Sequence, residues 1–439
     1  MIHIDIWRIL GRIPTVNWLI LAVCAVAFLG FYVLDYRKWG CLSFASYFFG
    51  FNYFLKVVVM YPFAWSANNV LATDRHFESI LVHLDKALYI TIGGFICMLS
   101  GIMAARVLTR RPPAACALVY DVLSRGWQSG GGVVVGALIV TVLTVALALM
   151  GFQAFIARSL VFEHNELRPF YNLWSQIVPF FAINAIVYGV TRRQWTALAL
   201  GVALASLGII GGNRTVAILT LMQAGVMLAM PKRFRNLPVM LLAALGLASV
   251  AVTIASLREA SLHDQRGFLF RLLYGNDLSD LRDFAWILTG MDDSPLFWGK
   301  TYMAGYLSFI PAYLFPFRVE FGFGRVSPAL AGLDPMFHSG LRPPIFGEMY
   351  VNFGLPGVAL GGFLYGLLVG RVMVWITRML DLPEGADKPV SQVVVWTGFI
   401  LLQIIDSVVF TPAFFGVYVL AALLILGQVL ARIGARRYA

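Results

Sequence analysis

The sequence predicts an all-α protein that crosses a membrane many times. Of its 439 residues, 60% are hydrophobic and only 13% are charged, and the mean hydropathy is +0.80. A soluble globular protein is roughly half apolar and about one quarter charged. Apolar runs long enough to cross a bilayer as helices, each about 20 residues, recur along the chain. We therefore expect a single membrane domain over residues 1–439.

The apolar runs predict about eleven transmembrane helices. The first run follows a short N-terminal arm and ends at Asp35–Lys38 without a small-residue cleavage site, so we expect a retained helix rather than a signal peptide. The expected helices are 17–34, 41–62, 87–108, 133–152, 170–190, 194–212, 214–231, 237–257, 355–376, 390–410 and 413–431. The glycine series within 361–370 is typical of close helix packing in membranes.

The positive charge indicates the orientation. The net charge is +11, and arginine and lysine gather in alternate links between the apolar runs. Such an excess marks the cytoplasmic side, so the C-terminus is expected inside and the stretch 258–345 outside. The same placement argues against nucleic acid, the partner that this charge would suggest in a soluble protein. An odd number of helices would place the N-terminus outside, which Arg8 and Arg12 oppose.

The stretch 258–345 is the longest hydrophilic part of the chain. Loops beyond roughly 15 residues are usually functional or disordered, and this one is rich in aromatic residues. We expect a short helix from Asp277 through Thr289. Leu296–Phe315 is apolar but broken by glycine and proline, which predicts a re-entrant or interfacial segment. Function is expected in this loop.

Several common sites are not encoded. The four cysteines show neither CxxC nor Cys/His spacing, so we expect no disulfide framework, no structural zinc and no other metal site. The sequence also lacks Walker, GxSxG and HExxH motifs.

Arg214 is the first candidate for binding an anion. It follows Gly211-Gly212-Asn213 and is placed where a span begins at the outer face, with Asn213 as a suitable N-cap. Free backbone N–H groups and the helix dipole favour phosphate at such a position. The alternative is an arginine whose side chain only reaches the interface.

The segment 338–357 holds the candidates for acid–base chemistry. Pro343 and Pro344 can open a short helix, and Gly354–Gly357 should break it before the next span. Glu348 or His338 could act as general base for a sugar hydroxyl. A favourable charge at a helix start is the alternative role for Glu348.

Seven arginines of the large loop could hold phosphate oxygens, although solvated ion pairs are the alternative. We expect Arg266, Arg271 and Arg342 to bind substrate. Lys56 and Asp406 lie within apolar runs, where charges usually mark a function or a mutual pair; an interfacial position is the alternative, since each is several residues from a predicted end.

The chain resembles the Wzy-type polysaccharide repeat-unit polymerases, which are related to O-antigen ligases. The resemblance rests on Gly212-Asn213-Arg214-Thr215 before a span, on the large outward loop, and on the pattern Gly347-Glu348-x-Tyr350-x-Asn352-Phe353-Gly354-x-x-Gly357. The arrangement of spans and loop is similar over most of the chain, whereas only a few residues match the motifs.

The resemblance implies a GT-C-like membrane glycosyltransferase that needs no metal and no cofactor. Such an enzyme would act at the periplasmic face of the bacterial inner membrane on an undecaprenyl-diphosphate-linked glycan. Arg214, Arg266, Arg271 and Arg342 would stabilise the diphosphate leaving group. Glu348 or His338 would be the base, and Tyr350, Tyr302 and Tyr306 could stack on sugars. Membrane lipids and a chain-length regulator protein are the further expected partners.

Three other functions compete with polymerisation. An O-antigen ligase would share the architecture and the donor and would transfer the glycan to lipid A-core. A flippase for the same lipid would show internal repeats with paired broken helices, and the sequence has no such repeat. A structural protein of the envelope would need no arginine at a helix start near the membrane.

Overall fold

The computed structural model of the chain describes residues 10–11, 13–39, 49–70, 77–109, 113–129, 131–149, 168–210, 214–229, 278–335, 340–381 and 391–437. Every regular element in these ranges is a helix, which confirms the predicted all-α class for this part of the chain. The chain divides into two compact units. Unit 1 comprises Met1–Arg111, Gln265–Val374 and Leu402–Phe415, and unit 2 comprises the remainder. The expectation of a single membrane domain stays a prediction.

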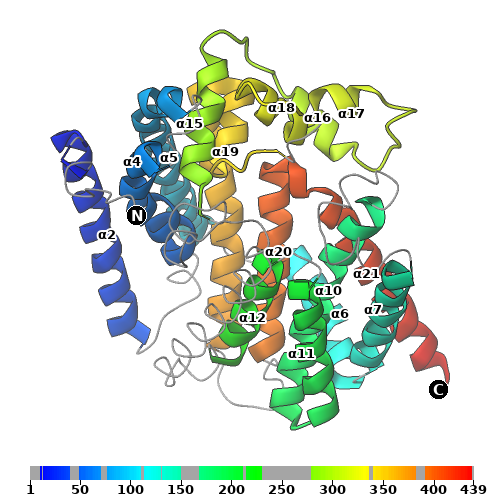
Figure 1. Cartoon of the computed structure of the whole chain (residues 1–439). Helices are drawn as coiled ribbons and strands as arrows, with labels where there is room; N and C mark the ends of the chain where they lie inside the picture. Colours follow the sequence, from blue (N-terminus) through cyan, green and yellow to red (C-terminus); the bar gives the residue numbers. More distant parts are fainter. Residues whose placement is uncertain are drawn as a thin grey trace. The chain divides into compact units, whose positions relative to one another are not determined.

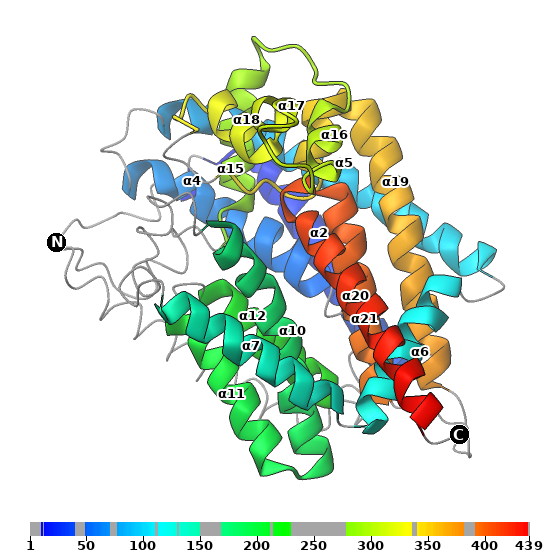
Figure 2. The same cartoon turned by 90° about the vertical axis from the view of Figure 1, so that its right-hand side faces the viewer.

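Unit 1 combines N-terminal helices with the helices of the large loop. Its elements are α2 (Thr15–Trp39), the π-helix η1 (Gly50–Val59), α4 (Met60–Val70), α5 (Phe77–Leu108), α15 (Asp280–Met291), α16 (Lys300–Tyr306), α17 (Phe317–Phe321), α18 (Phe323–Leu330), most of α19 (Phe346–Leu380), the end of α20 (Ser391–Val409) and the 3₁₀ turn η4 (Thr411–Ala413). Figures 1 and 2 show α15–α18 gathered at the N-terminal end of α19.

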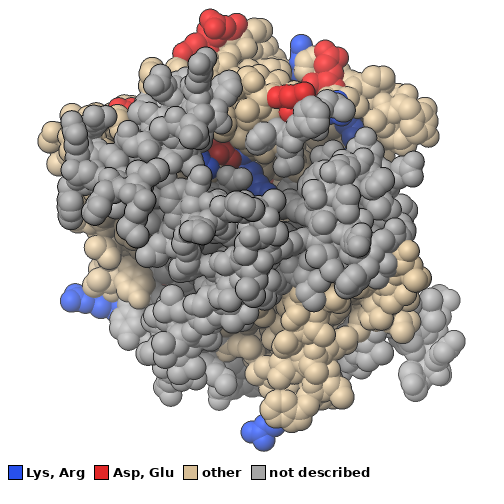
Figure 3. Space-filling model, viewed as in Figure 1, with Lys and Arg blue, Asp and Glu red and all other residues tan. Residues whose placement is uncertain are grey.

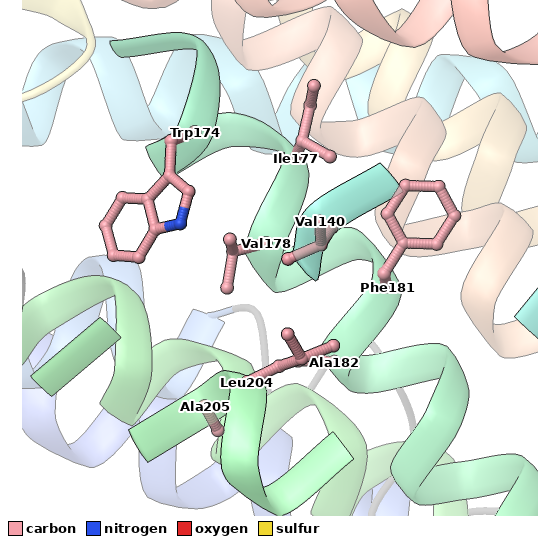
Figure 4. Close-up of a cluster of buried hydrophobic side chains, with 8 residues drawn as sticks. All are labelled: Val140, Trp174, Ile177, Val178, Phe181, Ala182, Leu204 and Ala205. Carbon is pink, nitrogen blue, oxygen red and sulfur yellow. The ribbon is translucent and has the colours of Figure 1, made fainter. Parts of the chain in front are cut away.

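Unit 2 contains the middle of the chain and the C-terminal helix. Its elements are α6 (Ala114–Ser129), α7 (Gly131–Leu149), α10 (Arg168–Arg192), α11 (Trp195–Ile210), α12 (Arg214–Ala229), the first part of α20 and α21 (Phe415–Arg437) from Gly416 onward. Its core is apolar: side chains from α7, α10 and α11 meet around Trp174 and Phe181 (Figure 4). The buried members are Val140, Trp174, Ile177, Val178, Phe181, Ala182, Leu204 and Ala205.

Long apolar helices confirm the prediction of a multi-pass membrane protein at this coarse level. Within the described residues, the segments long and apolar enough to cross a bilayer are Thr15–Asp35, Val82–Leu108, Leu173–Arg192, Phe346–Leu380 and Ser391–Val409. Three further expected spans correspond to shorter apolar helices, at Gly136–Val145, Trp195–Leu207 and Phe415–Leu426. The expected span 237–257 lies outside the described residues. The total of eleven and the predicted orientation stay predictions.

The predicted small-residue packing occurs between α5 and α19. A Cβ atom added at Gly366 would lie 1.9 Å from the carbonyl oxygen of Met98, and one at Gly101 would lie 2.0 Å from that of Phe363. The two backbones therefore approach so closely that only glycine fits at these positions. This contact fixes the membrane part of α19, whose first turns carry the candidate site.

Two local features differ from the sequence-based expectation. Residues 114–129, which lie between the expected spans 87–108 and 133–152, form the amphipathic helix α6. It buries Cys116, Val119, Leu123 and Trp127, at the spacing of one helical face. The expected span 41–62 is described only from residue 49, and the ten-residue π-helix η1 (Gly50–Val59) precedes α4 in it. π-Helical turns are rare in proteins, and those that occur are often found at functional sites.

The predicted helix break near Gly354–Gly357 is present. Gly354 adopts φ 64° and ψ −154° inside α19, a conformation that favours glycine. The first two turns of α19, which carry Glu348 and Asn352, thus run at an angle to the remainder. The expected helix at 277–289 is α15, which begins at Asp280 and extends to Met291.

Candidate functional site: a buried carboxylate beside a loop groove

The structure describes part of the predicted site. The described side chains among the candidates all belong to unit 1: Glu348, Arg342, Tyr350, Tyr302 and Tyr306. Arg214 begins α12 in unit 2, as expected for a residue at a helix N-terminus, and its side chain is outside the described part. His338, Arg266 and Arg271 lie outside the described residues.

Glu348 is the centre of a hydrogen-bond network that joins three segments. Its side chain is fully buried. The hydroxyl groups of Thr301 in α16 and Thr411 in η4 donate to its Oε1 at 2.7 and 2.6 Å. The backbone N–H of Thr411 donates to its Oε2 at 2.8 Å. The carboxylate therefore connects the large loop, the start of α19 and the end of α20.

Asn352 completes this network one turn further along α19. Its Nδ2 donates to the Thr301 hydroxyl at 2.6 Å and to the Glu348 carbonyl oxygen at 2.9 Å. Its Oδ1 accepts the backbone N–H of Gly299 at 3.0 Å. We call Thr301, Glu348, Asn352 and Thr411 the carboxylate node. Every one of these side chains is buried and hydrogen-bonded, as buried polar groups require.

Close packing supports the node. Gly305 of α16 lies against Thr411, and a Cβ atom at position 305 would be only 2.3 Å from the Thr411 Cβ. A glycine is therefore needed for α16 to reach η4. Among the described residues, no hydrogen-bond partner of Glu348 carries a positive charge. Neutral donors alone must replace the water that a buried carboxylate loses.

The backbone before α16 is strained and held by α19. Trp298 has a φ of 50°, which is uncommon for a residue other than glycine, and Gly299 follows with φ 85°. The N–H of Trp298 donates to the Asn352 carbonyl oxygen at 2.9 Å, and that of Phe297 donates to the Val351 oxygen at 3.2 Å. Strain of this kind persists only where surrounding contacts fix it.

An aromatic row runs beside the node. Tyr302 stacks on Phe353 with ring centroids 6.2 Å apart and an interplanar angle of 11°. Tyr306 lies 5.9 Å from Tyr302 and 4.7 Å from Phe414, and its hydroxyl donates to the Val408 carbonyl oxygen at 2.6 Å. Burial, and then the nearby Glu348 carboxylate, raise the pKa of both tyrosines. Their hydroxyls thus remain protonated at neutral pH.

Tyr350 packs elsewhere. Its ring meets Phe284 of α15 edge-on, with centroids 6.1 Å apart. The structure thus brings Tyr302 and Tyr306 together in the row and places Tyr350 against α15.

The helices of the large loop also form a groove. It has a volume of about 540 Å³, which falls within the range typical of small-molecule sites. Phe297 and Phe321 line it together with Glu320, Arg325 and Ser294, and aliphatic residues of α17 and α18 complete the walls. We call it the loop groove. Figure 3 shows acidic and basic side chains gathered at the top of the view, where α15–α18 lie.

Contacts between neighbouring residues link the loop groove to the segments that carry the carboxylate node. Phe297 lines the groove, and its backbone is hydrogen-bonded to Val351 of α19. Phe323, at the start of α18, packs edge-on against Phe410, the residue before Thr411, at 5.7 Å. These contacts hold the loop segments of the groove against the start of α19 and the residues after α20.

Arg342 lies next to a buried acidic residue. Its backbone N–H donates to Asp283 Oδ2 at 3.0 Å, and its side chain is exposed. Burial raises the pKa of Asp283 to about 6, against the opposing effects of Arg282 and of the Arg342 N–H. Burial likewise lowers the pKa of Arg282, against Asp283. In the part of the chain that the structure describes, Arg342 forms no ion pair, so its guanidinium is available to an anion.

Ion pairs attach both ends of α15 to η1 and α5. Lys56 of η1 binds Asp280 with a distance of 2.8 Å between Nζ and Oδ2. Lys86 of α5 binds Asp292 at 3.0 Å, and the Lys86 hydrogen bond lowers the pKa of Asp292. Asp406 accepts a hydrogen bond from the Tyr365 hydroxyl at 2.6 Å. Lys56 and Asp406, the two charges that the sequence places within apolar runs, thus bind Asp280 and Tyr365.

No protein-family model, curated protein or solved structure matches the chain. The site therefore rests on the residues and the geometry of this chain.

Sequence reasoning identified Glu348 but missed its partners. Asn352 stands four residues after Glu348, a spacing that places both on one helix face and could have been used. Thr411 follows Glu348 by 63 residues, and nothing in the local sequence indicates that contact. The loop groove was also missed, because its lining residues come from separate short helices.

Proposed function

We propose that this protein is a membrane glycosyltransferase that polymerises undecaprenyl-diphosphate-linked oligosaccharide repeat units at the periplasmic face of the bacterial inner membrane. The observation that carries the proposal is the loop groove, which lies next to the carboxylate node at the start of a membrane-spanning helix. A lipid-linked glycan requires this combination of a membrane-embedded region and an adjoining polar and aromatic surface. The row Phe353, Tyr302, Tyr306 and Phe414 supports it further, because aromatic faces stack on sugar rings.

The proposed reaction forms one glycosidic bond per cycle. The bond between the anomeric carbon of the donor glycan and its diphosphate oxygen breaks, and undecaprenyl diphosphate leaves with the bonding electron pair. A hydroxyl oxygen of the incoming lipid-linked unit attacks that carbon and loses its proton to a base. The exposed guanidinium of Arg342 is the described group best suited to stabilise the diphosphate.

The base is Glu348 or His338 in this proposal. Glu348 is buried and its carboxylate accepts three hydrogen bonds, which supports a positioning role for it in the described conformation. Acting as base would require a rearrangement that exposes one oxygen to the acceptor hydroxyl, since a base must come within hydrogen-bond reach of the proton. His338 carries the base role if Glu348 does not.

Two sets of variants separate these roles. Glu348→Gln keeps the shape of the side chain and removes the base, whereas the double variant Thr301→Val and Thr411→Val removes donors to Glu348 and leaves a carboxylate. If Glu348 positions the loop, both sets lose activity to a similar degree and the pH–rate profile keeps its form. If Glu348 is the base, Glu348→Gln abolishes turnover, whereas the double variant keeps a measurable rate because its carboxylate is still present.

The reaction is tested with purified protein in vesicles and a defined lipid-linked repeat unit. We expect a ladder of glycans that differ by one repeat and remain attached to undecaprenyl diphosphate. Transfer only to added lipid A-core would identify a ligase, and movement of the lipid across the bilayer without a new bond would identify a flippase. Either result would overturn the proposal of a polymerase.

A further inference from the structure

The connection between α16 and α17 carries an exposed apolar surface without charge. No charged residue occurs between Lys300 and Arg318. Within this stretch Phe309, Tyr313 and Leu314 are exposed, and Tyr313 has 82% of its surface accessible. Large apolar side chains gathered in one short segment indicate a surface that is covered by something other than water. We call residues 307–316 the apolar wedge.

The backbone of the apolar wedge is hydrogen-bonded within the protein. Leu314 and Phe315 donate their N–H groups to the Pro311 carbonyl oxygen at 3.0 and 3.1 Å, and Ile310 donates to that of Leu307 at 3.0 Å. Pro311 and Pro316 have no N–H group to satisfy. In a segment that meets hydrocarbon, backbone polar groups must find partners inside the protein. In the wedge, the N–H groups of Ile310, Leu314 and Phe315 have such partners, and the two prolines need none.

Arg318 supplies the donors that the backbone lacks. Its Nη1 donates to the carbonyl oxygens of Ser308 and Ile310, each at 2.7 Å. The guanidinium thus satisfies two carbonyl groups of the turn that carries Phe309. Tilted ring contacts at the base of the wedge, Phe315 with Phe317 at 5.5 Å and Phe317 with Phe321 at 4.5 Å between centroids, support this arrangement.

The exposed surface of α19 extends to the same loop. Leu360, Leu364 and Leu368 are exposed at intervals of four residues, which makes a stripe along one face of this membrane-spanning helix. Towards the helix start this surface continues through Phe353, also exposed, which contacts Tyr302 of α16. Exposed Trp298 and Met303 lie on either side of Tyr302 in the chain. Tryptophan and tyrosine are the residues enriched at membrane–water interfaces.

We propose that the apolar wedge inserts into the bilayer surface at which α19 begins, so that lipid covers Phe309, Tyr313 and Leu314. The occupant is bilayer lipid itself, because the wedge is free of charge, its backbone is internally satisfied, and the apolar surface of α19 leads to the same loop. Interfacial segments of this kind lie at the boundary between headgroups and acyl chains. Insertion would hold α16 and α17, and with them the loop groove, at headgroup depth.

Fluorescent labels at single cysteines test the insertion. The background carries alanine in place of Cys24, Cys41, Cys97 and Cys116, and an environment-sensitive NBD dye is attached to Phe309→Cys or Leu314→Cys. Asp293→Cys is the matched control, an exposed charged position in the same loop. The full chain is placed in nanodiscs of phosphatidylethanolamine and phosphatidylglycerol, one protein per disc and without any lipid-linked saccharide.

We expect the labels at 309 and 314 to emit at shorter wavelength and to lose most of their emission when the lipids carry a doxyl group near the headgroup. Aqueous iodide should quench them far less than it quenches the label at 293. The inference is overturned if iodide quenches all three labels equally. It is also overturned if the labels at 309 and 314 are shielded from iodide but insensitive to doxyl lipid, because a protein or a second copy would then cover the wedge.

A second measurement requires no substitution. Hydroxyl-radical footprinting of the unmodified chain in the same nanodiscs reports on Tyr313. We expect Tyr313 to resist oxidation although it is the most exposed tyrosine among those described. Oxidation at the rate of a water-exposed tyrosine would contradict insertion. Neither measurement uses a glycan substrate, so both outcomes are independent of the proposed reaction.

Discussion

The carboxylate node of unit 1 and the apolar cluster of unit 2 stabilise their units by different means. In unit 2, Trp174, Phe181 and Leu204 are buried among other apolar side chains, and the requirement is one of volume and shape. In the node, Glu348 and Asn352 are buried and held by six hydrogen bonds with neutral groups, and the requirement is one of hydrogen-bond direction. Substitutions that change side-chain shape should therefore destabilise the apolar cluster of unit 2, and substitutions that change polarity should destabilise the carboxylate node.

The largest effect is expected from removing the carboxylate. Glu348→Ala leaves the hydroxyl of Thr301 and two donors of Thr411 buried without their acceptor, and it opens a cavity. We predict a loss of about 4 kcal/mol in the free energy of unfolding of unit 1, since buried unsatisfied groups and cavities are each costly. Thermal unfolding in detergent measures it. A variant as stable as the wild type would show that the node contributes little.

The second largest effect is expected from a substitution that tests the close approach of α16 to η4. In Gly305→Ala the new Cβ would overlap Thr411, so we predict a loss of about 3 kcal/mol from overpacking. Gly126→Ala in α6 is the matched control, because nothing lies within 4 Å of its added Cβ. That variant should be neutral or more stable by up to about 1 kcal/mol. Equal effects of the two substitutions would contradict the described packing.

Asp283 makes the stability of the loop depend on pH. Its pKa is raised to about 6 in the folded protein, so the folded state binds the proton more tightly than the unfolded chain does. The stabilisation is present at low pH and is lost as the pH rises from about 4 through about 6. We predict that Asp283→Asn reduces this dependence by about 2 kcal/mol. The unfolding temperatures of the wild type and of Asp283→Asn are measured from pH 4.5 to pH 7.5. A difference between the two proteins that stays constant over this range would contradict the prediction.

The smallest effect is expected in the apolar cluster. Leu204→Met preserves volume and polarity, so we predict a loss below about 1.5 kcal/mol. The corresponding substitution in the node, Glu348→Gln, also preserves volume but places an amide donor against the donors of Thr301 or Thr411, and we expect a larger loss. Both losses in the free energy of unfolding are measured under the same conditions. A loss for Leu204→Met as large as that for Glu348→Gln would contradict the stated difference between the two regions.

Much of the fold follows from apolar composition. The helices α2, α5, α10, α19 and α20 coincide with long apolar runs, because a membrane helix is specified by length and hydrophobicity alone. The break at Gly354 and the glycine contacts of α19 were also predictable, since both depend on the absence of a Cβ atom.

The features that escaped prediction depend on contacts distant in sequence or on local geometry. Helix α6 was hidden because Arg125 and nearby charges suggested a link, although Val119 and Trp127 form a buried face. The π-helical geometry of η1 has no recognisable residue pattern. The partners of Glu348 come from α16 and η4, and only the folded chain brings Thr411 to it.

The proposed reaction depends on whether a groove next to the carboxylate node serves a lipid-linked glycan. The most direct test is chain elongation by the purified wild-type protein in vesicles, compared with the double variant Thr301→Val and Thr411→Val. We predict a ladder of lipid-linked glycans for the wild type and a strong loss of elongation in the variant, at temperatures where both remain folded. A folded wild-type protein that leaves the complete lipid-linked repeat unit unextended would contradict the proposal.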